Sequence, residues 1–238
     1  SLISVCIVTY NHMHFIAPAI QSVLDQNYPN VEIIVADDAS TDGTVDIIRD
    51  FCTKYPTRIK AHLSLINQGI SRNCNAGLKL CTGEYLCFLG GDDLFLPGKI
   101  TAQFSWFQQH PEAALCGCGV EVFDSDSGRI MAVVRDKVLR QGGNVGRVIR
   151  QSCATPTSAF MFRMAKCGGI TFDERTPIVS DWLFNIEACT RGKYGCVEGI
   201  YLRYRRHAGN ITAYGSIRSH LEDRLVYTDI YLARYFRD

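Results

Sequence analysis

The sequence predicts an α/β protein with a mostly parallel central sheet flanked by helices. Within residues 1–93, short apolar segments typical of strands alternate with amphipathic segments typical of helices. The strand segments are apolar nearly throughout, as in parallel strands that are covered on both faces. Polar residues follow the ends of these strands, where open α/β sheets bind their ligands. Together these observations predict a ligand site at one edge of the sheet.

Four strands and three helices are expected in the first half of the chain. Each helix segment carries apolar residues at helical spacing, and Ser40 or Thr41 is a plausible N-cap for the second one. The expected strands span residues 3–10, 31–38, 59–66 and 83–93, and the expected helices lie within residues 11–30, 40–56 and 67–81.

The alternation becomes less regular after Pro97. An Asp-Ser-Asp-Ser-Gly turn predicts a pair of strands within residues 114–134, and residues 135–155 are basic and glycine-rich. Helices are expected at 99–113, 180–197 and 216–238, a strand and helix at 159–172, and a late strand at 199–212. We therefore expect one domain, residues 1–238, with a nucleotide-binding half (1–97) and a mixed acceptor-side half (98–238).

Composition gives no sign of a strongly charged partner. The 238 residues are 47% hydrophobic and 21% charged, with a formal net charge of +1, so nucleic acid is not expected to bind. No apolar run is long enough for a transmembrane segment, and the opening residues read as a core strand rather than a signal peptide. We expect a cytoplasmic chain, with peripheral association at the inner face of the membrane as an option. The 11 cysteines are expected to be mostly buried free thiols.

The usual phosphate-binding loops are absent. The first strand is followed by Thr9-Tyr10-Asn11 without the glycine-rich turn of a dinucleotide site, which argues against a dehydrogenase, and no P-loop occurs. Asp92 and Asp93 instead follow the fourth strand, at the predicted ligand edge. Placing two negative charges next to each other there is costly unless a cation lies between them. A divalent cation, Mn²⁺ or Mg²⁺, is the expected substitute for a phosphate loop.

A set of motifs, in this order and spacing, resembles glycosyltransferase family 2. The matching segments are VTYN (8–11), DDASTDGT (37–44), NQG (67–69), RNCNAG (72–77), GEYLCFLGGDD (83–93), PTSAFMFR (156–163), SDW (180–182) and RYRRHAGNIT (203–212). The resemblance implies the Rossmann-like GT-A fold and an inverting, sugar-nucleotide-dependent transfer. One departure is Gly90, which stands where the family usually has the first acid of its Asp-x-Asp motif.

The resemblance also implies a role for individual residues. Asp92 would hold the metal and Asp181 would be the general base, although an acid at a helix start is also favoured by the helix dipole alone. Asp38 would accept the imide N–H of a uracil-like base, with helix capping as the alternative, and Arg72 could equally form a surface ion pair. The implied donor-binding residues are Thr9, Tyr10, Asn11, Asp37, Asp38, Asn67, Gly69, Arg72, Asp93 and His207, and the implied acceptor residues are Thr157, Ser158 and Trp182.

The sequence therefore predicts a transferase that moves a sugar from a nucleoside diphosphate sugar, by preference a UDP-sugar. The acceptor would be a glycan or a lipid-linked sugar in bacterial surface polysaccharide synthesis, which rests on family analogy alone. Gly90 leaves a second reading open, in which a catalytically weak or inactive transferase-like domain binds a glycan. The chain could also be one domain of a longer polypeptide.

Overall fold

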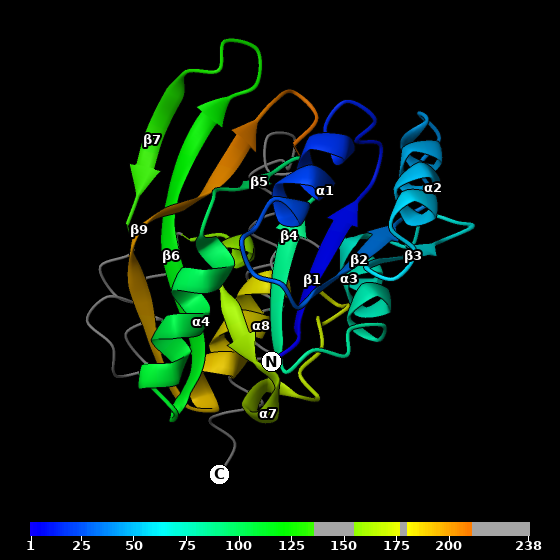
Figure 1. Cartoon of the computed structure of the whole chain (residues 1–238). Helices are drawn as coiled ribbons and strands as arrows, with labels where there is room; N and C mark the ends of the chain where they lie inside the picture. The colour runs from blue at the N-terminus through cyan, green and yellow to red at the C-terminus, as the bar shows by residue number, and fades with distance from the viewer. Residues whose placement is uncertain (136–154, 177–179, 211–238) are drawn as a thin grey trace.

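A single mixed sheet runs through the computed structural model, which describes residues 1–135, 155–176 and 180–210 (Figure 1). The strand order is β3-β2-β1-β4-β8-β6-β9-β5, and β7 pairs with β6. The predicted helix at 216–238, and all of the predicted loop and short helix at 135–155 except its two end residues, lie outside the described residues.

The first half has the predicted parallel arrangement. β1 (Ile3–Thr9) pairs in parallel with β2 (Val31–Asp37) and β4 (Tyr85–Gly90), and β2 pairs in parallel with β3 (Ile59–Leu63). β3 is shorter than expected, because the chain turns away at Ser64 and leaves Leu65 97% exposed. The carboxyl ends of β1, β2 and β4 therefore share one edge of the sheet.

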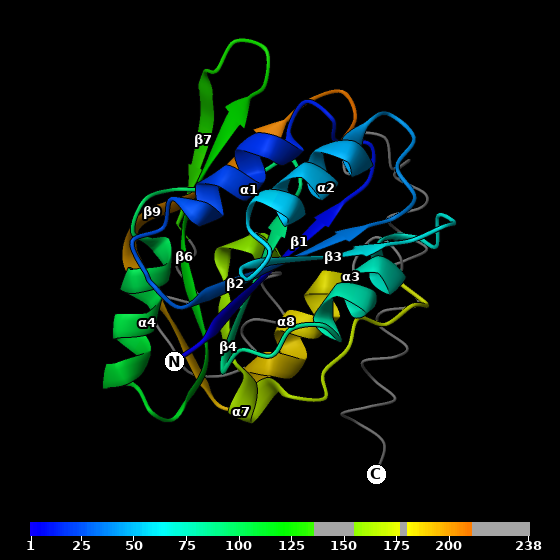
Figure 2. The same ribbon diagram turned by 45° about the vertical axis from the view of Figure 1, so that its right-hand side comes forward.

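Helices cover both faces of this sheet (Figure 2). α1 (Ile16–Leu24), α2 (Thr44–Lys54) and α4 (Lys99–Gln109) contribute to a core cluster with one face of β1. α3 (Ile70–Leu78), α7 (Met164–Cys167) and α8 (Ser180–Thr190) contribute to a second cluster, which contains Cys6 of β1. Successive residues of β1 thus enter different cores, as the period of a strand requires.

The second half extends the sheet with mixed directions. β8 (Met161–Arg163) is antiparallel to both β4 and β6 (Ala113–Asp124), and η1 (Thr157–Ala159) precedes it. β6 and β7 (Ile130–Val134) form the predicted hairpin, which projects from the body of the molecule (Figure 1). No helix in the described ranges is long and apolar enough to cross a membrane.

The last described strand differs from its expected bounds. β9 (Lys193–Arg206) begins six residues earlier than the expected strand at 199–212, and it runs parallel to β6. A two-residue strand, β5 (Leu94–Phe95), directly follows the Asp92-Asp93 turn and pairs antiparallel with β9. This pairing brings the end of β9 beside the acidic turn and so builds the candidate site. The α/β fold with a mixed sheet and flanking helices confirms the predicted class.

Candidate active site

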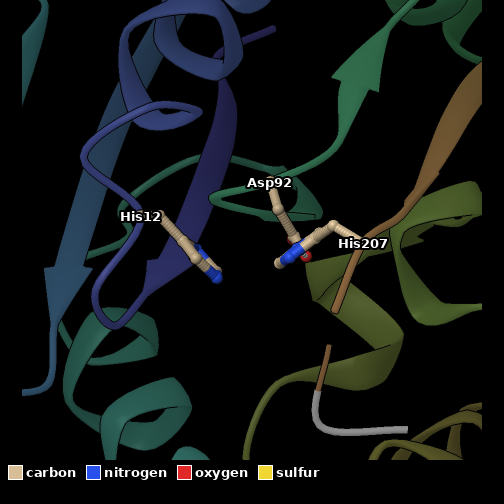
Figure 3. A group of neighbouring side chains, drawn as sticks. All are labelled: His12, Asp92 and His207. Atoms are coloured by element: carbon tan, nitrogen blue, oxygen red, sulfur yellow. Dashed lines mark hydrogen bonds and ion pairs between the residues drawn. The ribbon is translucent and has the colours of Figure 1, made fainter. Parts of the chain in front are cut away.

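The loop after β1 points an imidazole toward the end of β4 (Figure 3). Asn11 adopts a positive φ of 53° and accepts a hydrogen bond from the Thr41 backbone N–H at 2.9 Å. The backbone N–H of His12 donates to Thr44 Oγ1 at 2.9 Å, and the His12 ring atom Nδ1 lies 3.2 Å from Thr9 Oγ1. These contacts fix the loop on the segment after β2 and orient the His12 side chain.

The two glycines of the turn after β4 leave room for these side chains. A Cβ on Gly91 would lie 2.5 Å from Thr9 Oγ1 and 2.9 Å from His12 Nδ1, both shorter than a normal contact. A Cβ on Gly90 would lie 2.7 Å from an oxygen of Asp92. A larger residue at position 90, such as the acid that the family usually has there, would therefore require the Asp92 side chain to move.

Asp92 is held by side chains from the end of β9. Its Oδ2 atom lies 3.1 Å from His207 Nε2 and accepts a hydrogen bond from Asn210 Nδ2 at 2.9 Å. One potential ligand atom from each of His12, Asp92 and His207 lies within 4.8 Å of the other two. Burial raises the pKa of Asp92, but the His207 hydrogen bond and the nearby imidazoles outweigh it and lower the pKa overall. Burial lowers the pKa of His12, which favours the neutral, metal-binding form of imidazole.

Asp93 is bonded quite differently from its neighbour. It is 3% exposed, and its Oδ1 atom accepts the backbone N–H of Arg205 at 2.9 Å. Burial and the charge of Asp92 raise the pKa of Asp93 well above its ordinary value. The two adjacent carboxyls therefore tend to share a single negative charge, which relieves part of the repulsion that the sequence predicts.

Arg205, within the basic run of β9, is directed into the fold. Its Nε atom donates to the backbone oxygen of Asp92 at 2.7 Å, and its guanidinium lies 4.7 Å from the ring of Phe15 and 4.6 Å from that of Phe123. Arg203 in the same run forms an ion pair with Glu121. These two arginines support the acidic turn and the strand, rather than extending toward solvent.

The two acids after β2, Asp37 and Asp38, accept hydrogen bonds from the backbone of nearby loops. Asp38 accepts the backbone N–H groups of Gln68 and Gly69, one on each carboxylate oxygen and both at 2.8 Å. Asp37 accepts the backbone N–H of Ser40 at 2.9 Å and also the Ser40 hydroxyl. The carboxylates thus organise the backbone around the expected base pocket, and direct contact with a nucleotide stays a prediction.

The other expected donor residues line the same edge with more exposure. Tyr10 is 43% exposed, and Asn67 lies in the exposed loop that Asp38 shapes. Gly69 adopts a φ of +88° at the start of α3. Arg72 pairs with Glu174 at 2.9 Å, which is the surface ion pair that the sequence left as an alternative.

Asp181 lies in the first turn of α8. Thr157 Oγ1 donates to its Oδ2 atom at 3.3 Å, and Asn185 Nδ2 donates to Thr157 Oγ1 at 2.9 Å. Burial raises the pKa of Asp181, and hydrogen bonds from the Trp182 backbone and Thr157 only partly oppose this. Ser158 and Trp182 are partly exposed and adjoin this pair in the chain.

The start of α8 is attached to the start of α3. Ser180 Oγ and Ser71 Oγ lie 2.8 Å apart. Burial raises the pKa of the Cys74 thiol on α3, and the charges of both Asp181 and Asp38 raise it further. The contact between Ser180 and Ser71 places Asp181, the next residue of α8, near the start of α3 and so near the loop that Asp38 holds.

Two residues of the site were missed by sequence reasoning. Asn210 lies within the RYRRHAGNIT motif, and its bond to Asp92 depends on the turn after β9. His12 directly follows the VTYN motif, and a histidine one residue beyond a strand-end motif was the available signal. Its distance of 80 residues in sequence from Asp92 concealed their proximity.

Comparison with solved structures supports the same fold. The chain aligns over its full length with S. aureus TarS in complex with UDP-GlcNAc, at a TM-score of 0.74 and 21% identity, covering 68% of that chain. A mannosyltransferase from Pyrobaculum calidifontis, in complex with GDP-Man and Mn²⁺, aligns with 99% of this chain and 64% of its own at a TM-score of 0.62 and 18% identity.

Curated relatives and a family profile extend the comparison to sequence. A glycosyltransferase of Nostoc sp. with no characterised activity is 32% identical over 169 residues, which is 68% of this chain and 50% of the relative. An uncharacterised protein of Mycobacterium bovis is 29% identical over 226 residues, which is 93% of this chain and 64% of the relative. The chain thus covers less than two thirds of either relative. The profile described as Glycosyl transferase family 2 matches residues 4–167, and the chain belongs to this family.

Proposed function

We propose that this chain is an inverting, metal-dependent hexosyltransferase that uses a nucleoside diphosphate sugar, by preference a UDP-sugar. The acceptor is a hydroxyl of a glycan or lipid-linked sugar in bacterial surface polysaccharide synthesis. The observation that carries the proposal is the cluster of His12, Asp92 and His207 beyond the carboxyl ends of the strands. Burial raises the pKa of a second carboxylate, Asp181, which lies in the first turn of α8, where Ser180 contacts Ser71 at the start of α3.

The residues around Asp92 fit a divalent cation. They offer a carboxylate oxygen and two imidazole nitrogens, and the Asp92 and His207 side chains are only 16% and 12% exposed. Asp92 would hold the cation, with the imidazoles beside it, and Asp93 would contact the donor. When bound, Mn²⁺ or Mg²⁺ supplies positive charge that stabilises the departing diphosphate.

Asp181 is suited to accept the proton of the acceptor hydroxyl. A base works best when its pKa lies near the working pH, and burial raises the pKa of Asp181 in that direction. The hydroxyl of Thr157 donates to one oxygen of the carboxylate and so orients it. Attack by the deprotonating hydroxyl opposite the leaving diphosphate gives inversion at the anomeric carbon. Ser158 and Trp182 would flank the acceptor.

The choice of a UDP-sugar as donor draws on the structural neighbours and on the residues at the carboxyl ends of the strands. TarS is described in complex with UDP-GlcNAc, and together with Asp38 as the expected acceptor for a uracil imide N–H this is the basis for preferring a UDP-sugar. Thr9, Tyr10 and Asn11 would line the base and ribose pocket, with Asp37 and Asp38 beneath it. Asn67, Gly69, Arg72 and His207 would approach the nucleotide and its phosphates from the surrounding loops.

Replacement of Asp181 by Asn tests the proposed chemistry. General-base loss costs about 10²- to 10⁴-fold in rate, so Asp181→Asn should lose transfer while UDP binding, measured by calorimetry with Mn²⁺, stays unchanged. Asp50→Asn, on the exposed face of α2, is the matched control and should retain wild-type turnover. Near-normal turnover of Asp181→Asn would disprove the assigned base.

Gly90 favours one other candidate, a transferase-like domain that binds a glycan without catalysis. Gly90 lacks the carboxylate that the family usually has at this position. A Cβ at Gly90 would lie 2.7 Å from an oxygen of Asp92, so glycine fits the orientation that Asp92 has in this chain. Slow hydrolysis of a UDP-sugar by the purified protein, without acceptor, distinguishes the two candidates. Hydrolysis that depends on Mn²⁺ or Mg²⁺ supports the enzyme, and its absence across a panel of UDP-sugars supports the binding domain.

A further inference from the structure

We propose that His12 is a direct ligand of the cation beside Asp92 and that it makes the site prefer Mn²⁺ to Mg²⁺. The inference deepens the proposed function, because both place a cation at Asp92. It adds a third protein ligand from the loop after β1 and a reason for metal selectivity. The argument rests on how the three side chains of Figure 3 are supported and on which nitrogen of each imidazole is free.

The His12 ring is fixed by the fold around it. Thr9 Oγ1 contacts Nδ1 on one side, and the missing Cβ of Gly91 provides the space in which this pair sits. The backbone N–H groups of His12 and Met13 are bonded to Thr44 and Asp42, so the loop cannot easily swing the ring away. Metal-binding histidines characteristically use their second ring nitrogen for such an orienting hydrogen bond.

The two imidazoles differ in their readiness to bind a cation. His207 Nδ1 accepts the backbone N–H of Gly209 at 3.1 Å, so the neutral ring carries its proton on Nε2 and donates it to Asp92. A cation could bind His207 Nε2 only after that proton moves. His12 faces no such conflict, because the Thr9 hydroxyl can accept a hydrogen bond from Nδ1–H and leave the Nε2 lone pair free.

The spacing of the three ligand atoms suits a divalent cation. They all lie within 4.8 Å of one another, which is about twice a metal–ligand distance of ~2.0–2.6 Å. Mg²⁺ favours oxygen ligands and retains much of its water, whereas imidazole nitrogen raises affinity for first-row transition metals. A site that adds the free imidazole nitrogen of His12 to the Asp92 carboxylate therefore favours Mn²⁺ over Mg²⁺.

Direct metal binding, without nucleotide, tests the proposal. The free Mn²⁺ signal in electron paramagnetic resonance gives the Mn²⁺ affinity, and displacement by Mg²⁺ gives the relative affinity of the two cations. We expect wild type to bind Mn²⁺ at least ~10-fold more tightly than Mg²⁺. His12→Asn should lose ~10-fold or more in Mn²⁺ affinity and most of this preference. His14→Asn alters an exposed histidine of the same loop and should match wild type.

Unchanged Mn²⁺ affinity in folded His12→Asn, or equal Mn²⁺ and Mg²⁺ affinities in wild type, would overturn the proposal. Circular dichroism and thermal melting report whether the variant folds. If it does not, pulsed electron resonance on Mn²⁺ bound to wild type and to His207→Asn, both labelled with ¹⁵N-histidine, still decides. Imidazole coupling to bound Mn²⁺ that persists in labelled His207→Asn supports His12 as a ligand, and coupling that is lost in His207→Asn contradicts it. Because no nucleotide is used, metal binding can succeed even where the proposed UDP-sugar chemistry fails.

Discussion

Two Asp-Asp pairs leave buried strands at the same edge of the sheet, yet they are bonded in opposite ways. After β2, Asp37 and Asp38 accept hydrogen bonds from the backbone of the neighbouring loops and from the Ser40 hydroxyl. After β4, Asp92 is held by the side chains of His207 and Asn210, with the His12 ring beside them. The β2 pair and Asp93 hold the backbone, whereas Asp92 presents a charge to side chains that can exchange partners.

The hydrogen-bond partners distinguish carboxylates that hold the backbone from a carboxylate that is available to bind a cation. The sequence alone does not make this distinction, because both pairs read Asp-Asp. A carboxylate that accepts two backbone N–H groups is costly to replace, because the donors lose their acceptor. A carboxylate surrounded by imidazoles can release those contacts to a cation with little effect on the backbone. The β2 pair should therefore matter chiefly for stability, and Asp92 chiefly for metal binding and catalysis.

The largest expected effect is at Asp92. Asp92→Asn keeps an oxygen for His207 and Asn210 but loses the charge, so Mn²⁺ binding should fall below detection. Transfer should drop at least ~1000-fold, since a metal ion supplies several kcal/mol of charge stabilisation. The free energy of unfolding, measured in EDTA, should change by less than about 1 kcal/mol. Full activity of the variant, or wild-type activity in excess EDTA, would remove Asp92 from the metal site.

Asp38 should behave in the opposite way. Asp38→Ala leaves the N–H groups of Gln68 and Gly69 without their acceptor and should lower the free energy of unfolding by about 2–4 kcal/mol. Asp38→Asn keeps one acceptor and should cost about half as much. Urea denaturation measures both. If Asp38→Ala is as stable as wild type but no longer binds UDP, the carboxylate is a nucleotide ligand rather than a loop closure.

Much of the fold could be predicted because local pattern and tertiary structure agree in the first half. The nearly continuous apolar runs at β1, β2 and β4 are buried on both faces, as their composition predicts. The start of β9 was missed because the expected helix at 180–197 included residues 193–197, whereas α8 ends at Thr190 and β9 begins at Lys193. Its pairing with β6, which includes register shifts, holds it in the sheet.

The candidate site was only partly predictable for a physical reason. Motifs identify single carboxylates, but the partners of Asp92 come from the loop after β1 and the end of β9. Their meeting depends on β5, a two-residue strand too short to leave a sequence signal. The inward course of Arg205 between two aromatic rings likewise depends on neighbours that are distant in sequence.

A smaller effect should appear in the pH dependence of transfer. Asp181 must be ionised to accept a proton, and burial raises its pKa, so the rate should rise with pH and level off above the ordinary range of an aspartate. Below that pKa the rate should fall about tenfold per pH unit. Thr157→Val removes a hydrogen bond that favours the ionised form, so the acid limb should move to higher pH. An unmoved limb would mean that Thr157 does not act on this carboxylate.

The smallest expected effect separates Asp93 from Asp92. Because the folded pKa of Asp93 is raised, the folded protein holds a proton that the unfolded chain releases, and stability falls as pH rises from the unfolded toward the folded pKa. Asp93→Asn retains an acceptor for the Arg205 N–H without this penalty. In EDTA it should raise the free energy of unfolding at pH 8 by on the order of 1 kcal/mol, with less gain at pH 4.

Asp126→Asn, in the exposed turn between β6 and β7, is the matched control and should show no such pH-dependent gain. A loss of stability in Asp93→Asn at pH 8 would mean that Asp93 is ionised in the folded protein and favourably paired with the arginines of β9. The acid pair would then carry two charges instead of one. In that case the cation would be needed to fold the turn as well as to serve the reaction, and EDTA alone should destabilise the wild-type protein.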